Sequence, residues 1–147
     1  MFKTILAAVD GSDHAMKALD TAAEMAVMQK ARLLILSVYS HFSPMENTHS
    51  LVRARQELAP PDDALREFAS DVVKVAAERA RASGAREMDT FIAEGHPART
   101  IVEFARDKKV DLIVMGNRGW GDVGSFLLGS VSHKVNSLAE CTCITVK

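Results

Sequence analysis

Cysteine is scarce in this chain of 147 residues, and its placement fits neither a disulfide-rich nor a zinc-binding class. The two cysteines, Cys141 and Cys143, are one residue apart, which excludes a disulfide framework and fits a reducing compartment. The five histidines are dispersed and have no zinc-ligand spacing among themselves or with the cysteines. We therefore expect two reduced thiols and no metal centre built from these side chains.

The chain also has almost no net charge and no long apolar run. Lysine and arginine number 18 against 19 aspartate and glutamate, so no long-range field attracts nucleic acid or an anionic membrane, and any phosphate site must be local. The longest candidate for a signal or membrane core, residues 5–9, is far shorter than either requires. The sequence therefore predicts a cytoplasmic protein with neither nucleic-acid binding nor membrane insertion.

What the sequence does contain is an alternation of short apolar runs and longer stretches with helical spacing, which is typical of βαβ units around a parallel sheet. The length and the 48% hydrophobic content fit a single domain over residues 1–147. We expect strands at residues 4–10, 33–38, 87–93, 111–115 and 142–147, and helices at 15–26, 65–80, 97–109 and 130–139. The charges within 87–93 indicate a sheet edge.

Residues 40–61 interrupt this alternation. They show no sustained hydrophobic period, and Pro44, Pro60 and Pro61 punctuate them. We expect a long loop here, which is either a tolerated insertion or a mobile lid over a ligand.

The most informative segment is a glycine-rich connection between a strand and a helix. Gly116-Asn117-Arg118-Gly119 is followed, after nine residues, by Gly129-Ser130-Val131-Ser132. The N-terminus of a helix leaves backbone N–H groups unpaired, and the helix dipole favours an anion there, with phosphate as the natural occupant. The glycines are expected to approach the ligand closely or to take positive φ, with serine hydroxyls as added donors. The alternative is a merely flexible connection.

Two better-known phosphate motifs do not fit this segment. A P-loop needs a lysine between its last glycine and the serine, and Gly129-Ser130 has none. Residues 119–124 match the dinucleotide fingerprint G-x-G-x-x-G literally, but only 23 residues follow Gly124, too few for the rest of a dinucleotide-binding unit.

The spacing Gly116-x2-Gly119-x9-Gly129-Ser130 resembles the motif of the ATP-binding branch of the universal stress protein family. The strand end Val9-Asp10-Gly11-Ser12 and the segment 110–116 are also similar to landmarks of that family. The resemblance implies an α/β, Rossmann-like fold: a five-stranded parallel sheet in the order 3-2-1-4-5 with helices on both faces. Ligands of such sheets bind beyond the carboxyl ends of the strands where the order reverses, here between strands 1 and 4.

The same resemblance implies a set of binding residues. Asp10 would contact the ribose region, the Val38 backbone would meet the adenine edge, and Met115 and Gly116 would form the floor. The phosphates of ATP or AMP, accompanied by magnesium, would be held by Gly119, Gly129, Ser130, Val131 and Ser132. From the residues alone, Asp10 is open to a second interpretation as a turn or capping carboxylate.

The function expected from these observations is that of an ATP-binding regulatory protein of the stress response, with at most slow hydrolysis, because no activated nucleophile or acid–base pair stands out. The uncharged last strand and the family resemblance favour a homodimer through that strand, and an unidentified protein partner is implied. One alternative is an adenine-nucleotide enzyme, an ATPase or adenylyl-transfer catalyst. Another is an interaction module of the same fold that binds no nucleotide.

Overall fold

The structure is a computed structural model that describes residues 1–40, 62–119 and 128–147. All but the first residue of the loop expected at 40–61, and all but the first residue of the 119–124 glycine run, therefore lie outside the described residues. The strands are β1 (Thr4–Ala8), β2 (Arg32–Tyr39), β3 (Met88–Glu94), β4 (Leu112–Gly116) and β5 (Thr142–Val146). The helices are α1 (Asp13–Gln29), α3 (Asp62–Ala82), α4 (Pro97–Asp107) and α5 (Ser130–Leu138).

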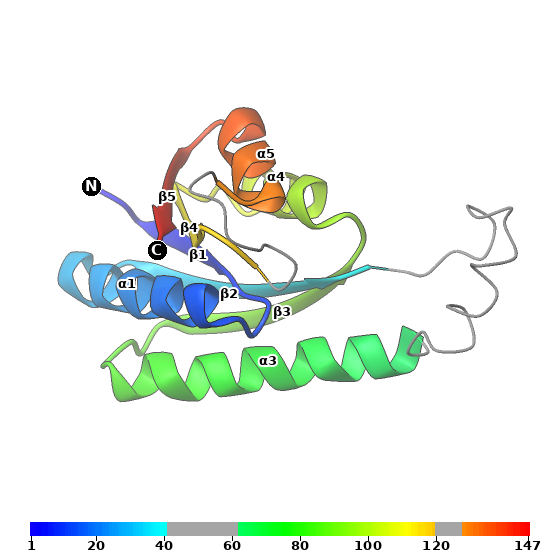
Figure 1. Cartoon of the computed structure of the whole chain (residues 1–147). Helices are drawn as coiled ribbons and strands as arrows, with labels where there is room; N and C mark the ends of the chain where they lie inside the picture. The colour runs from blue at the N-terminus through cyan, green and yellow to red at the C-terminus, as the bar shows by residue number, and fades with distance from the viewer. Residues whose placement is uncertain (41–61, 120–127) are drawn as a thin grey trace, which may run out of the picture.

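The five strands form one parallel sheet in the order β3-β2-β1-β4-β5, which confirms the expected topology (Figure 1). The central strand β1 pairs with β2 on one side and β4 on the other. The chain first builds outward through β2 and β3, then returns to the other side of β1 with β4 and β5. The order therefore reverses between β1 and β4, where a crevice forms in sheets of this type.

Helices cover both faces of the sheet (Figure 1). Alternate strand residues pack on the two sides. In β1, Ile5 and Ala7 pack with α1 and α3, whereas Leu6 and Ala8 pack with α4 and α5. The continuous apolar run of this strand reflects burial on both faces. The side of α1 toward the sheet is almost entirely alanine, and these small side chains let the helix lie close to the strands.

Element boundaries follow from local chemistry. Ser12 is the N-cap of α1, and its hydroxyl accepts a hydrogen bond from the Ala15 N–H. β1 is two residues shorter than expected, although Val9 still donates to the Leu36 carbonyl. α3 begins at Asp62, three residues before the expected start. The sequence pattern missed this turn because the first turn of a surface helix can be polar and then shows no apolar period.

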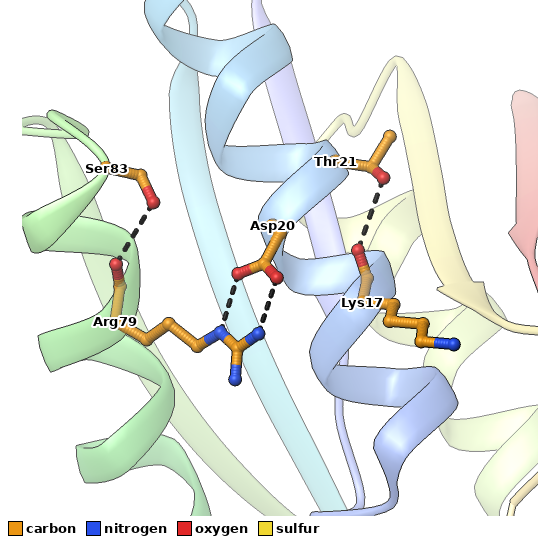
Figure 2. A network of polar contacts seen from close by, with 5 residues as sticks. All are labelled: Lys17, Asp20, Thr21, Arg79 and Ser83. Atoms are coloured by element: carbon orange, nitrogen blue, oxygen red, sulfur yellow. Dashed lines mark hydrogen bonds and ion pairs between the residues drawn. The ribbon is translucent and has the colours of Figure 1, made fainter.

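A bidentate ion pair joins the two helices on one face of the sheet, as Figure 2 shows. The Arg79 guanidinium of α3 donates to both carboxylate oxygens of Asp20 on α1, each at 2.6 Å. These hydrogen bonds raise the pKa of Arg79 above its ordinary value. Both side chains are substantially exposed, so we assign the pair only about 0.2–1 kcal/mol of stability. Packing of the apolar helix faces contributes far more to this layer.

The two edges of the sheet differ in charge. The edge strand β3 carries Asp89 and Glu94, and Asp89 accepts a hydrogen bond from Arg32 of the neighbouring strand at 2.8 Å. This confirms the expected edge position of that segment. The opposite edge strand, β5, has the sequence Thr-Cys-Ile-Thr-Val and no charged residue. Within the described ranges, no helix is both long and apolar enough to cross a membrane.

Candidate functional site

A cavity of about 350 Å³ opens where β1 and β4 end. All nine residues expected to bind a ligand line it: Asp10, Val38, Met115, Gly116, Gly119, Gly129, Ser130, Val131 and Ser132. They come from four separate parts of the chain, and the parallel topology brings them together because the strands end at one edge of the sheet. The volume suits a small-molecule ligand.

The cavity has an apolar part and a polar part. Leu36 and Val38 of β2, Ile101 of α4 and Met115 of β4 supply apolar side chains. The first turn of α5, together with Arg118, supplies hydrogen-bond donors and a positive charge. This division suits a ligand with a flat, weakly polar ring at one end and anionic groups at the other.

The N-terminus of α5 is built in a way that leaves backbone donors available. Its N-cap is Gly129, which has no side chain to cap the helix, and its first turn contains no acidic residue. The first helical hydrogen bond runs from the His133 N–H to the Gly129 carbonyl, at 2.9 Å. The N–H groups of Ser130, Val131 and Ser132 therefore precede the helical ladder, at the positive end of the helix dipole.

The loop before α5 is closed by hydrogen bonds that use two of the expected ligand donors. The Gly129 N–H donates to the Asn117 carbonyl at 2.7 Å. The buried Ser132 hydroxyl lies 3.0 Å from the carbonyl oxygens of both Asn117 and Gly129, to which it donates. These two groups fasten the helix start to the end of β4. The first turn of α5 still offers an anion its three leading N–H groups and the Ser130 hydroxyl.

Gly116 and Gly119 lie against other parts of the protein. The sequence left two expectations for the three glycines of the motif, close approach to a ligand or positive φ. Gly116, Gly119 and Gly129 all have ordinary backbone angles, so positive φ does not occur at these positions. A Cβ on Gly116 would lie 2.8 Å from the backbone of His14 and Ala15, because α1 starts directly beside the end of β4. A Cβ on Gly119 would lie 2.7 Å from the Asp10 carboxylate. Both contacts are closer than a side chain tolerates.

Asp10 combines a turn role with a place in the cavity. Its Oδ1 accepts hydrogen bonds from the backbone N–H and the hydroxyl of Ser12, which fixes the start of α1. It is also the only carboxylate that lines the cavity among the described residues. Asp10 is therefore a turn carboxylate, as one of the two interpretations held, and it also lines the cavity.

Eight lining residues were not among the nine expected: Ala8, Val9, Ala15, Leu36, Pro97, Ile101, Asn117 and Arg118. Pro97 and Ile101 were assigned only to a helix. In a parallel sheet, however, a helix that follows a strand begins near the carboxyl ends of the strands, and α4 lies beside the cavity there. Asn117 occupies an unspecified position of the glycine motif, but it is buried and lines the cavity. Its N–H donates to the carbonyl of Val146 at the end of β5, at 2.7 Å, so the β4–β5 ladder continues one residue past the strand.

Cys141 and Cys143 lie away from this cavity and pack against the α4–α5 side of the sheet. Burial raises the pKa of both thiols. The pKa of Cys143 rises to about 11, and the neighbouring Cys141 contributes to this increase.

We expect alkylation of Cys143 by iodoacetamide to be slow at pH 7–8 and to accelerate as pH rises toward 11, because only the thiolate reacts. Mass spectrometry across a pH series measures this, and a rate plateau near pH 8 contradicts it.

The described residues contain no group of three or more histidine, cysteine or acidic side chains that could hold a metal ion. A divalent ion in the cavity would therefore take most of its ligands from the bound molecule and from water, as Mg²⁺ commonly does in phosphate sites.

Known proteins resemble the chain over its whole length. Residues 1–147 match the model of the universal stress protein family. A universal stress protein of Thermus aquaticus is 40% identical over 149 aligned residues, with both chains covered completely. Universal stress protein YxiE of Bacillus subtilis is 37% identical over 154 residues, again with complete coverage of both.

Solved structures agree with the fold. Universal stress protein UspA from Lactobacillus plantarum superposes with a TM-score of 0.81 at 29% identity, covering 99% of this chain and 97% of the other. A universal stress protein in complex with cAMP superposes with a TM-score of 0.74 at 27% identity, with the same coverage. The sequence match and the shared topology lead to one conclusion: the chain belongs to the universal stress protein family.

Proposed function

We propose that this protein binds an adenine nucleotide, ATP or AMP, in the cavity at the ends of β1 and β4. The observation that carries the proposal is the uncapped N-terminus of α5, whose three leading N–H groups belong to residues that line the cavity. A helix start of this kind favours phosphate. The apolar part of the cavity, beside Val38 and Ile101, suits the adenine ring.

The relatives support the same ligand class. A family member with 27% identity and the same fold was solved in complex with cAMP, an adenine nucleotide. In the proposed complex, Asp10 contacts the ribose, the Val38 backbone meets the adenine edge, and Met115 and Gly116 form the floor. Gly119 brings the loop close to Asp10, and the first turn of α5 holds the phosphates, with magnesium bound to them.

We assign the protein a regulatory role in the stress response rather than a catalytic one. Among the described residues lining the cavity there is one carboxylate, Asp10, and no histidine or cysteine, so no acid–base pair is placed against a bound phosphate. Nucleotide occupancy would then act through conformation or through a protein partner in the cytoplasm, with at most slow hydrolysis. The uncharged edge strand β5 is the proposed site of homodimer formation.

The first test is the nucleotide content of freshly purified protein. We expect denaturation to release ATP, AMP or a hydrolysis product at close to one per chain, identified by chromatography and mass spectrometry. The variant Gly119→Val should lose this nucleotide, because its side chain displaces Asp10, whereas Ser83→Ala at the far end of α3 should retain it. Protein that is empty and also fails to bind added ATP would favour the interaction-module alternative.

A further inference from the structure

Asn117 is one of the residues that line the polar part of the cavity, and its place at the end of β4 sets the side to which its side chain points. Successive residues of β4 alternate between the two faces of the sheet: Val114 packs with the α1 side and Met115 with the α4–α5 side. Gly116 lies against α1, and the β4–β5 ladder continues through the Asn117 N–H. Asn117 therefore points to the α4–α5 side, and it lines the cavity beside the start of α5.

Among the described residues, the carboxamide oxygen of Asn117 has no hydrogen-bond partner. The residue is 3% exposed, and its Oδ1 is buried, although both backbone groups of Asn117 are hydrogen bonded. A buried carbonyl oxygen without a donor is energetically unfavourable, because it has lost its hydrogen bonds to water. Because the Cβ–Cγ torsion of asparagine is soft, the carboxamide can turn its oxygen toward a group bound in the cavity.

The chemistry of the ligand limits which group can satisfy this oxygen. Phosphate oxygens at neutral pH accept hydrogen bonds, so they repel a carbonyl oxygen and attract the N–H groups of α5. A divalent cation on the phosphates attracts it, and so do the water molecules in the cation's hydration shell, which are strong donors. Amide oxygens are among the ligands of hard cations such as Mg²⁺ and Ca²⁺.

We propose that Asn117 Oδ1 holds the divalent cation that accompanies the nucleotide phosphates, either directly or through a cation-bound water. The proposal rests on the proposed nucleotide-binding function and adds to it a residue that recognises the cation. It agrees with the absence of a three-residue metal cluster among the described residues, since a phosphate-bound Mg²⁺ needs only one or two protein oxygens. Asn117 thereby distinguishes the magnesium complex of the nucleotide from the free nucleotide.

Calorimetric titration with ATP, in the presence of MgCl₂ or of EDTA, tests the proposal on three proteins. The wild-type chain should bind ATP more tightly with Mg²⁺. In Asn117→Ala, the increase in ATP affinity on adding Mg²⁺ should be smaller than in the wild type by a factor of about ten or more, as is typical for removal of a group that supports a metal ion. Asn117→Asp keeps an oxygen ligand and adds a charge that repels free phosphate, so its gain from Mg²⁺ should equal or exceed that of the wild type. Circular dichroism confirms that each variant is folded.

Electron paramagnetic resonance of Mn²⁺ with ATP gives a second readout, and we expect the protein-bound Mn²⁺ signal to weaken in Asn117→Ala and to persist in Asn117→Asp. The cation assignment is overturned if Asn117→Ala binds ATP with the wild-type dependence on Mg²⁺. It is also overturned if that variant loses affinity equally with and without Mg²⁺, which indicates a direct phosphate contact instead. A wild-type chain that binds no ATP under either condition contradicts the proposed function itself.

Discussion

Replacement of Gly116 by alanine should lower the melting temperature by about 5–10 °C, the shift expected for a loss of roughly 2–3 kcal/mol in a domain of this size. The added Cβ would lie 2.8 Å from the backbone of His14 and Ala15, so it meets main-chain atoms that cannot rotate away. Either the start of α1 or the end of β4 must move, and both carry cavity residues. Differential scanning calorimetry measures the effect.

Gly119→Ala provides the matched control for this steric argument. Its Cβ would meet the Asp10 carboxylate at 2.7 Å, the far end of a side chain, which can turn aside more cheaply than backbone. We expect a melting temperature within a few degrees of the wild type, because such a side-chain adjustment costs about 1 kcal/mol, together with weaker nucleotide binding. Equal destabilisation by the two substitutions would show that backbone proximity is not what requires glycine at position 116.

Ser130→Asp should reduce ATP affinity by at least about 30-fold, corresponding to roughly 2 kcal/mol of repulsion between the new carboxylate and the phosphates. Ser130 is the first residue of α5, and the first turn of this helix has no acidic residue. A carboxylate there would compete for the same N–H groups and the same dipole that the phosphates use. Isothermal titration calorimetry measures the loss.

The same substitution should act in the opposite direction on the free protein. An acidic residue in the first turn of a helix stabilises it, typically by about 0.3–1 kcal/mol, so the nucleotide-free variant should melt at or slightly above the wild-type temperature. Ser130→Asn is the neutral control and should bind ATP nearly as the wild type does. If Ser130→Asp retains wild-type affinity, the phosphates do not bind at α5.

Much of the fold was accessible from sequence because burial on both faces leaves an unmistakable pattern. The run at Ile5 to Val9 and the alanine stripe of α1 each indicate one element without reference to any other. The strand order was not accessible in this way, since periodicity identifies strands but not their neighbours. It came from the family resemblance, and the structure confirmed it.

The topology explains why the site residues lie close together, but it does not predict the role of each one. Nothing in the spacing of the glycine motif reveals that Gly116 serves the packing of α1, or that the Ser132 hydroxyl is used to close the loop. Asn117 was passed over because the motif leaves its position unspecified. Such roles depend on contacts between segments that are distant in the chain, which a local pattern does not encode.

The difference in charge between the two sheet edges has a consequence for symmetry. In the proposed dimer, β5 would pair with the β5 of a second chain, and the contact would be isologous, with the same surface on both sides. The outer edges of the joined sheets would then both be β3, where Asp89 and Glu94 discourage further strand addition. Assembly through this contact would close at two chains and would not propagate into a filament.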